Sequence, residues 1–171
     1  AKMLRMLGIG LHVEGSFQSG AKLIVANHVS WLDIMAVHAV CPEVRFVSKA
    51  DVQRWPLLGR LVAAGGTLYI ERERPRDALR VVHQVAAALK AGDTVAVFPE
   101  GTTGDGRTLL PFHANLLQAA IATEMPVQPL ALRFSDAKHV VSPAADFVGD
   151  TTLVQSLWML ACGDRVVVRL K

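Results

Sequence analysis

His28 and Asp33 form the first pair in the sequence whose residue types and spacing could do chemistry. They lie in the stretch NHVSWLD (27–33), directly after the apolar run KLIVA (22–26). On a regular helix, residues five apart point about 140° away from each other. A histidine in the turn before a helix can instead fold back over the first helical turn. There an aspartate can hold one ring nitrogen and leave the other as a general base. This arrangement requires the helix to begin near Ser30, a natural N-cap.

The same stretch has a purely structural interpretation. Ser30 and Asp33 have a spacing similar to that of a capping box, which satisfies free backbone N–H groups at a helix start. His28 would then be an ordinary histidine at a strand end, and this fragment alone favours neither interpretation. The other histidines have no comparable partner: His12, His38, His83, His113 and His139.

The turn FPEGTT (98–103) is a second candidate for chemistry. It follows an apolar run, and its carboxylate, Glu100, and its backbone N–H groups could bind a substrate hydroxyl or stabilise an oxyanion. An ordinary glycine turn is the alternative. The overlapping GTTGDGRT (101–108) approaches a phosphate-binding loop, but Arg107 replaces the lysine and Pro111 falls where the helix must continue. We therefore exclude a nucleoside triphosphatase, although not an anion site.

Arg72 and Lys49 are candidate contacts for a phosphate group. The net charge of the chain is only +3, which gives no reason to expect nucleic acid, but residues 45–80 hold eight Lys/Arg and four Asp/Glu. Such a segment suits a phosphate-bearing partner or an anionic membrane face. Arginine pairs bidentately with phosphate, and Arg72 lies just after the apolar run 67–70. Ion pairing with the interleaved acidic residues is the competing explanation.

The pattern of apolar runs predicts the elements that must position these residues. We expect strands at 22–26, 44–48, 67–70, 94–98, 127–133 and 165–170, and helices near 31–40, 56–64, 77–91, 113–124 and 152–160. This alternation predicts an α/β fold, a single domain over 1–171 with a largely parallel central sheet and helices on both faces. Because ligand sites gather at the carboxyl ends of parallel strands, His28, Arg72 and Glu100 should meet there.

The composition is that of an apolar globular chain. Hydrophobic residues make up 51% of its 171 residues and charged residues 19%, which excludes intrinsic disorder. No apolar run reaches the roughly 18 residues of a transmembrane span, and the start lacks the pattern of a signal peptide. Cys41 and Cys162 have no metal-type spacing, so we interpret them as buried free thiols in a reducing compartment.

Taken together, these motifs resemble the glycerolipid acyltransferases, typified by 1-acyl-sn-glycerol-3-phosphate acyltransferase. The stretch 27–33 is similar to the H-x-x-x-x-D block of that family. The stretches GTLYIER (66–72), FPEGT (98–102) and VQPL (127–130) resemble its second, third and fourth blocks. Four blocks in the family's order are far more specific than any one of them.

The resemblance implies an O-acyltransferase of phospholipid biosynthesis. His28, oriented by Asp33, would take the proton from a lysophospholipid hydroxyl, converting lysophosphatidic acid to phosphatidic acid. The oxygen would attack the thioester of an acyl-CoA or acyl carrier protein directly, with no acyl-enzyme. Glu100 and Gly101 would position the acceptor and the reacting centre. No metal or cofactor is implied, because the thioester is already activated.

The resemblance also implies substrate-binding residues outside this catalytic group. Arg72 would hold the acceptor phosphate, with Lys49 as a weaker second contact. Thr102 belongs to the third block, and Pro129 in the fourth would shape the acyl pocket. The implied setting is the cytoplasmic face of the inner membrane, where the chain is peripheral or anchored by a segment N-terminal to residue 1. The stretch WPLL (55–58) would suit membrane contact.

Several alternatives stay open. GTTGDG followed by LLPF is similar to the branch that acylates lyso-ornithine lipids, an acceptor without phosphate that would leave Arg72 without its role. Glycerol 3-phosphate is a further acceptor. A hydrolase with a serine nucleophile is a rival from another class, although the chain has no G-x-S-x-G motif. A non-catalytic lipid-binding module gives no reason for His28 and Asp33 beside Glu100.

Overall fold

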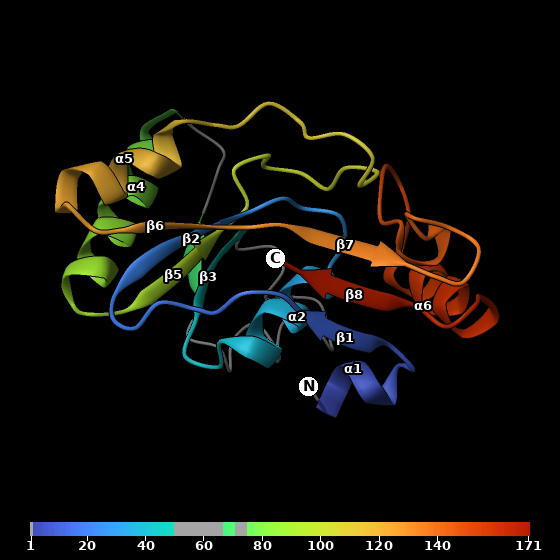
Figure 1. Cartoon of the computed structure of the whole chain (residues 1–171). Helices are drawn as coiled ribbons and strands as arrows, with labels where there is room; N and C mark the ends of the chain where they lie inside the picture. The colour runs from blue at the N-terminus through green and yellow to red at the C-terminus, as the bar shows by residue number, and fades with distance from the viewer. Residues whose placement is uncertain (1, 50–66, 71–74) are drawn as a thin grey trace.

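The computed structural model describes residues 2–49, 67–70 and 75–171, and its elements alternate between strands and helices (Figure 1). The helices are α1 (Lys2–Met6), α2 (Leu32–Val40), α4 (Pro75–Lys90), α5 (Asn115–Thr123) and α6 (Leu153–Cys162), with a 3-10 turn η2 (Pro143–Ala145). The strands are β1 (Gly10–Val13), β2 (Lys22–Ala26), β3 (Arg45–Lys49), β4 (Leu68–Ile70), β5 (Thr94–Val97), β6 (Val127–Leu130), β7 (Leu132–Ser135) and β8 (Val167–Leu170).

The described strands form two sheets, which confirms the predicted α/β class. Five parallel strands lie in the order β4-β3-β5-β2-β6, and three more lie in the order β1-β8-β7. In the smaller sheet β1 runs parallel to β8, whereas β7 runs antiparallel to it. Strand β2, which lies between β5 and β6, ends two residues before His28, and the polar turn that follows β5 lies beside the turn that follows β2.

The strand expected over 127–133 is divided in two. Pro129 lies in β6, which among the described strands is an edge strand paired with β2. Proline is tolerated in an edge strand, where an N–H that faces outward has no ladder partner. The chain then leaves this sheet at Ala131, which exchanges two backbone hydrogen bonds with Lys171, at 2.8 and 3.1 Å. The side chain of Asn27 also makes two hydrogen bonds to the backbone of Leu132. Its Nδ2 donates to the Leu132 carbonyl at 2.9 Å, and its Oδ1 accepts the Leu132 N–H at 2.7 Å. These contacts join the two sheets next to the end of β2.

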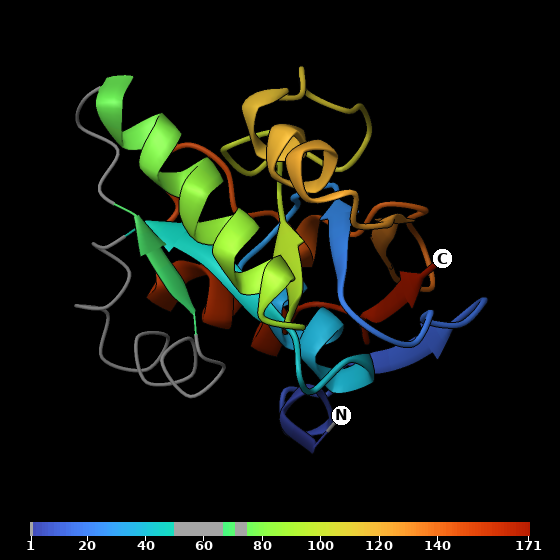
Figure 2. The ribbon, with the colours of Figure 1, turned by 90° about the vertical axis from the view of Figure 1, so that its left-hand side faces the viewer.

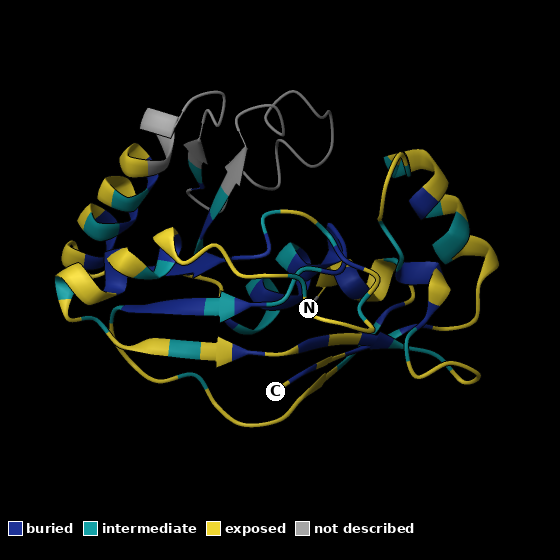
Figure 3. Cartoon of the chain, turned by 90° about the horizontal axis from the view of Figure 1, so that it is seen from above, coloured by how far each residue is buried: buried dark blue, intermediate teal, exposed yellow. Residues whose placement is uncertain are grey.

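Helices cover both faces of the larger sheet, as the continuous apolar runs of its strands predict. Leu23 of β2 packs with Val85 of α4 and other side chains of α4 and α5, whereas its neighbour Ile24 packs with Leu32 of α2 on the other face. Figure 2 shows α4 crossing the strands. Figure 3 shows buried strands between helices whose outer faces are exposed. This packing fixes β2 and β5, and with them the turns at their carboxyl ends.

Some expectations fall outside the described residues. The expected helix at 56–64, the stretch 55–58 and Arg72 lie there, and of Lys49 only the backbone, at the end of β3, is described. In the part of the chain that the structure does cover, no helix combines the length and the apolar character needed to cross a bilayer.

The two cysteines lie in different environments. Cys41, at the end of α2, is buried, but Cys162, at the end of α6, is exposed. The expectation of two buried thiols is therefore wrong for Cys162. The spacing alone could not distinguish them, because both are set among apolar residues in the sequence.

We expect a thiol reagent to modify native Cys162 quickly and Cys41 only after unfolding. Burial, together with a hydrogen bond from its Sγ to Glu43 Oε1 at 3.3 Å, raises the pKa of the Cys41 thiol to about 11. The thiolate is the reactive form, so Cys41 is both shielded and weakly ionised. The measurement is the rate of thiol labelling with and without urea, and Cys162→Ser is the control. Fast labelling of that variant in the absence of urea would contradict the expectation.

Candidate active site

His28 and Asp33 face each other across the start of α2. His28 Nδ1 lies 2.8 Å from Asp33 Oδ2, the Asp33 side chain is fully buried, and the His28 side chain is 20% exposed. A carboxylate offers only acceptor atoms, so Nδ1 carries the proton and donates it to Asp33. Nε2 keeps its lone pair, and among the residues that the structure describes it has no hydrogen-bond partner. The exposed part of the ring thus presents a base.

Asp33 also shapes the turn that carries the histidine. Its Oδ2 accepts hydrogen bonds from the N–H groups of Val29, at 2.7 Å, and Ser30, at 3.0 Å. Ser30 is not the N-cap that the sequence suggests. Trp31 holds that position with a helical backbone and no side-chain cap, and within the described chain the buried Ser30 Oγ has no partner. Of the two hydrogen bonds in a capping box, only the one from the Ser30 N–H to the Asp33 carboxylate is present. The same carboxylate orients His28.

Phe98 stacks against the face of the His28 imidazole. The two rings stack with centroids 4.2 Å apart and an interplanar angle of 15°, and Phe98 stacks in turn with Phe46, at 6.3 Å and 9°. With Asp33 at one ring nitrogen and Phe98 against its face, the His28 ring has little rotational freedom. Sequence analysis did not identify Phe98 as a site residue, and its place before the Pro-Glu-Gly turn was the only available signal.

Glu100 ties the turn after β5 to the turn after β2. Its Oε1 accepts the His28 backbone N–H at 2.7 Å, and its Oε2 accepts the Leu110 N–H at 2.8 Å. The Gly104 N–H donates to the His28 carbonyl at 2.8 Å, which closes a second link between the same two segments. Glu100 is only 5% exposed. In this structure it is a positioning residue, because both of its oxygens already accept backbone N–H groups.

Among the described residues, no hydrogen bond or ring contact joins Gly101, Thr102 or Pro129 to the His28 side chain. Gly101 has φ +73° and donates its N–H to Phe98 O at 3.1 Å, so it forms the tight turn that Glu100 needs. Thr102 is exposed beside it, and Pro129 is exposed on β6, where it pairs with Val25. Their contacts with substrate, like those of Arg72 and Lys49, stay predictions. The structure brings together His28, Asp33 and Glu100.

The loop after Glu100 packs against a distant segment and closes over the histidine turn. Thr103 Oγ1 donates a short hydrogen bond to Phe147 O. Gly106, at φ +70°, approaches so closely that a Cβ there would lie 3.2 Å from Val29 Cγ1 and 3.4 Å from Val141 Cγ1. Only glycine suits both this backbone conformation and this contact.

A charged group lies beside this loop. Burial raises the pKa of Asp146, whose carboxylate interacts electrostatically with Arg107 and Asp105. Its buried Oδ1 has no hydrogen-bond partner in the described residues. Those residues also hold no group of three or more His, Cys, Asp or Glu side chains arranged to bind a metal ion.

Comparison of the chain with known proteins shows the family to which it belongs. Residues 10–133 match the model of the family described as Acyltransferase. The chain is 36% identical to the lyso-ornithine lipid O-acyltransferase of Pseudomonas aeruginosa over 171 residues, which is 100% of this chain and 65% of that protein. It is 37% identical to the 1-acyl-sn-glycerol-3-phosphate acyltransferase of Neisseria meningitidis serogroup B over 172 residues, 98% of this chain and 66% of that protein.

A solved structure has a similar fold. The crystal structure of the 1-acyl-sn-glycerophosphate (LPA) acyltransferase from Thermotoga maritima superposes with a TM-score of 0.64 at 21% identity and covers 99% of this chain and 63% of that one. The fold of this chain is thus the α/β fold of that acyltransferase. The chain belongs to the acyltransferase family, in the group whose relatives act on lysophosphatidic acid or lyso-ornithine lipid. It spans about 65% of the length of these relatives.

Proposed function

We propose that this chain transfers a fatty acyl group from acyl-CoA or acyl carrier protein to the free hydroxyl of a lysophospholipid, forming phosphatidic acid from lysophosphatidic acid. The observation that carries the proposal is the His28–Asp33 pair, joined at 2.8 Å, with Nε2 free of any described partner. Membership in the acyltransferase family supports it. Because the acceptor is a membrane lipid, we infer that the reaction takes place at the cytoplasmic face of the inner membrane.

The geometry suits direct transfer by general-base catalysis. His28 Nε2 takes the proton as the acceptor oxygen forms a bond to the thioester carbonyl carbon. The resulting tetrahedral intermediate collapses, the C–S bond breaks, and the proton on His28 passes to the departing sulfur. Asp33 accepts from Nδ1 throughout, so it stabilises the imidazolium that forms between the two proton transfers. The products are the acylated lipid and the free thiol, and the histidine returns to its starting state.

A lyso-ornithine lipid is the second candidate acceptor, and one observation favours it. Asp146 interacts electrostatically with Asp105 and Arg107, which both lie in the loop that follows Glu100 and form an ion pair at 3.9 Å. Buried or partly exposed carboxylates attract an ammonium group and repel a phosphate. The head group of ornithine carries an ammonium and no phosphate. The relatives of both names match this chain at similar identity, so overall similarity does not distinguish the two acceptors.

We expect thiol release from palmitoyl-CoA to require an acceptor, and the preferred acceptor to identify the substrate. Lysophosphatidic acid and lyso-ornithine lipid are compared at equal concentration in the same detergent. If the carboxylates of Asp146 and Asp105 bind the ammonium group of the acceptor, Asp146→Asn should lower kcat/KM for lyso-ornithine lipid. The expected loss is roughly tenfold, the scale of one charge-assisted hydrogen bond. It should leave kcat/KM for lysophosphatidic acid unchanged or raised.

Two other outcomes have defined meanings. A parent chain that prefers lysophosphatidic acid, with Asp146→Asn neutral on both lipids, would reject the lyso-ornithine candidate. Equal release with and without any acceptor would reject acyl transfer and favour a hydrolase. Asp150→Asn, which changes an exposed carboxylate before α6, serves as the matched control for the change of charge.

A further inference from the structure

Helix α6 has no charged residue, yet it exposes an apolar stripe. Val154 is 76% exposed and Trp158 is 71% exposed, and Ala161 continues the stripe at the same helical spacing. Leu157 and Leu160 of the same helix are partly buried and pack against the core. A large aromatic and a branched aliphatic side chain exposed on one helix face form the kind of apolar surface that marks an interaction site.

This apolar surface continues toward the catalytic turn. Val148, 37% exposed, precedes α6, and its neighbour Phe147 accepts the hydrogen bond from Thr103 of the loop after Glu100. Leu109, 66% exposed, lies in that same loop. Figure 1 shows the loop after β5 reaching the segment that leads into α6. The Thr103–Phe147 hydrogen bond therefore joins the loop after Glu100 to the segment that leads into α6, and both segments expose apolar side chains.

The position of α6 relative to the catalytic pair is fixed. Trp31 Nε1, just before α2, donates a hydrogen bond to Ser156 Oγ of α6 at 3.0 Å, and both residues are buried. Asp33 lies two residues after Trp31. A partner bound to the outer face of α6 would therefore be held in one orientation relative to His28.

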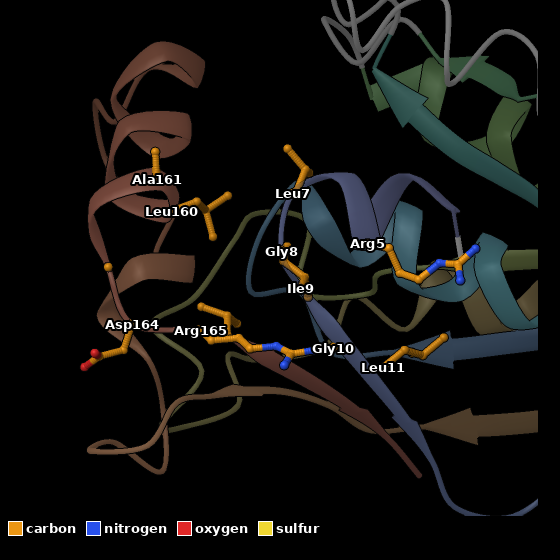
Figure 4. A pocket seen from close by; sticks show the side chains of 12 residues that line it. Arg5, Leu7, Gly8, Ile9, Gly10, Leu11, Leu160, Ala161, Asp164 and Arg165 are labelled. Carbon is orange, nitrogen blue, oxygen red and sulfur yellow. The ribbon is translucent and has the colours of Figure 1, made fainter.

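Two arginines line a cavity that Ala161, the last residue of the stripe, also lines, and in Figure 4 their side chains extend away from α6. The cavity, of about 850 Å³, lies between β1, the turn after α1 and the end of α6, and Arg5, Arg165 and Leu160 are among its lining residues (Figure 4). Neither arginine has an ion-pair partner among the described residues, whereas Asp164 is neutralised by Lys138 at 2.8 Å. An apolar helical face beside a cavity lined by arginines is the pattern of a surface that binds anionic lipid.

We propose that the outer face of α6, formed by Val154, Trp158 and Ala161 and adjoining the cavity that Arg5 and Arg165 line, docks the chain on an anionic lipid bilayer. The inference rests on the proposed function, whose acceptor is a membrane lipid. A bilayer fits better than a second copy of the chain. One stripe on a ten-residue helix falls short of the roughly 800 Å² per partner that a stable protein interface buries, and an interfacial helix needs only its apolar face.

The test is co-sedimentation of the 171-residue chain with vesicles of phosphatidylcholine, with and without phosphatidylglycerol. We expect the parent to bind the anionic vesicles, and V154S/W158S to bind them at least about tenfold more weakly because its apolar face is lost. We expect R5Q/R165Q to lose only the preference for anionic over neutral vesicles. Ile121→Ser is the matched control, since Ile121 is 66% exposed on α5, at the other end of the molecule from α6 (Figure 1).

Thermal unfolding of each variant shows whether the fold is kept, which is expected because the altered side chains are exposed. Parent protein that stays in the supernatant, or a V154S/W158S variant that binds like the parent, would overturn the proposal. A parent dimer in sedimentation velocity that V154S/W158S dissociates would assign the face to a second copy instead. Binding is measured without donor or acceptor, so a chain that docks but transfers no acyl group would refute the proposed function and not the docking surface.

Discussion

Replacing His28 with alanine is expected to lower acceptor-dependent thiol release by about 10²–10⁴-fold, the usual contribution of a general base. The loss follows from the geometry, since His28 is the ring that Asp33 and Phe98 orient and whose Nε2 is free to take a proton. The variant should still fold. The backbone N–H and carbonyl of residue 28 keep their hydrogen bonds to Glu100 and Gly104, because neither bond uses the side chain.

His139 provides the matched control for this variant. Its Nδ1 lies 2.9 Å from Asp136 Oδ1 and 3.1 Å from Asp136 Oδ2, so the chain contains a second histidine–aspartate pair, and the expectation that His139 has no comparable partner is wrong. That pair belongs to the turn after β7, where the hydrogen bonds that Asp136 accepts, above all from Ser142, hold the pKa of Asp136 well below its usual range. We expect His139→Ala to keep the parent rate. Equal losses in the two variants, or parental turnover by His28→Ala, would refute the assignment of His28 as the base.

The comparison of sequence and structure shows which features depend on local pattern. The run KLIVA is predicted as a strand at 22–26, and β2 has the same bounds, because a strand buried on both faces is a continuous apolar run. The helix expected at 77–91 appears as α4, Pro75–Lys90, since its apolar stripe has a clear period. By contrast, β1 has four residues and α1 has five, too few for any period to show.

Features that depend on distant contacts could not be predicted. The strand expected at 127–133 is divided because Ala131 pairs with Lys171, at the other end of the chain, and no local signal reports that pairing. The site likewise has one feature that local sequence predicts and one that depends on distant contacts. The spacing of His28 and Asp33 in a strand–turn–helix stretch was enough to suggest their contact. The stacking of Phe98 on His28 depends instead on where the carboxyl ends of β2 and β5 meet, which only the sheet order determines.

Glu100→Gln should reduce both stability and turnover, because it replaces one acceptor oxygen with an N–H donor at a place where two backbone N–H groups converge. In the parent, one oxygen accepts from His28 and the other from Leu110, at 2.7 and 2.8 Å. The glutamine amide can satisfy only one of them, and its own NH₂ faces the other. A buried donor left without an acceptor costs about 1–3 kcal/mol in the free energy of unfolding.

Turnover should fall by more than this loss of stability explains, by about 10²-fold, because the histidine turn is released from the loop that fixes it and small displacements of a reacting group are costly. Urea unfolding measures the loss in the free energy of unfolding. Thiol release, at a temperature where the variant is fully folded, measures the loss of turnover. Glu124→Gln is the control, since Glu124 is an exposed glutamate at the end of α5. Parental turnover in folded but destabilised Glu100→Gln would show that Glu100 serves the fold alone, and that His28 keeps its working position without the link to the turn after β5.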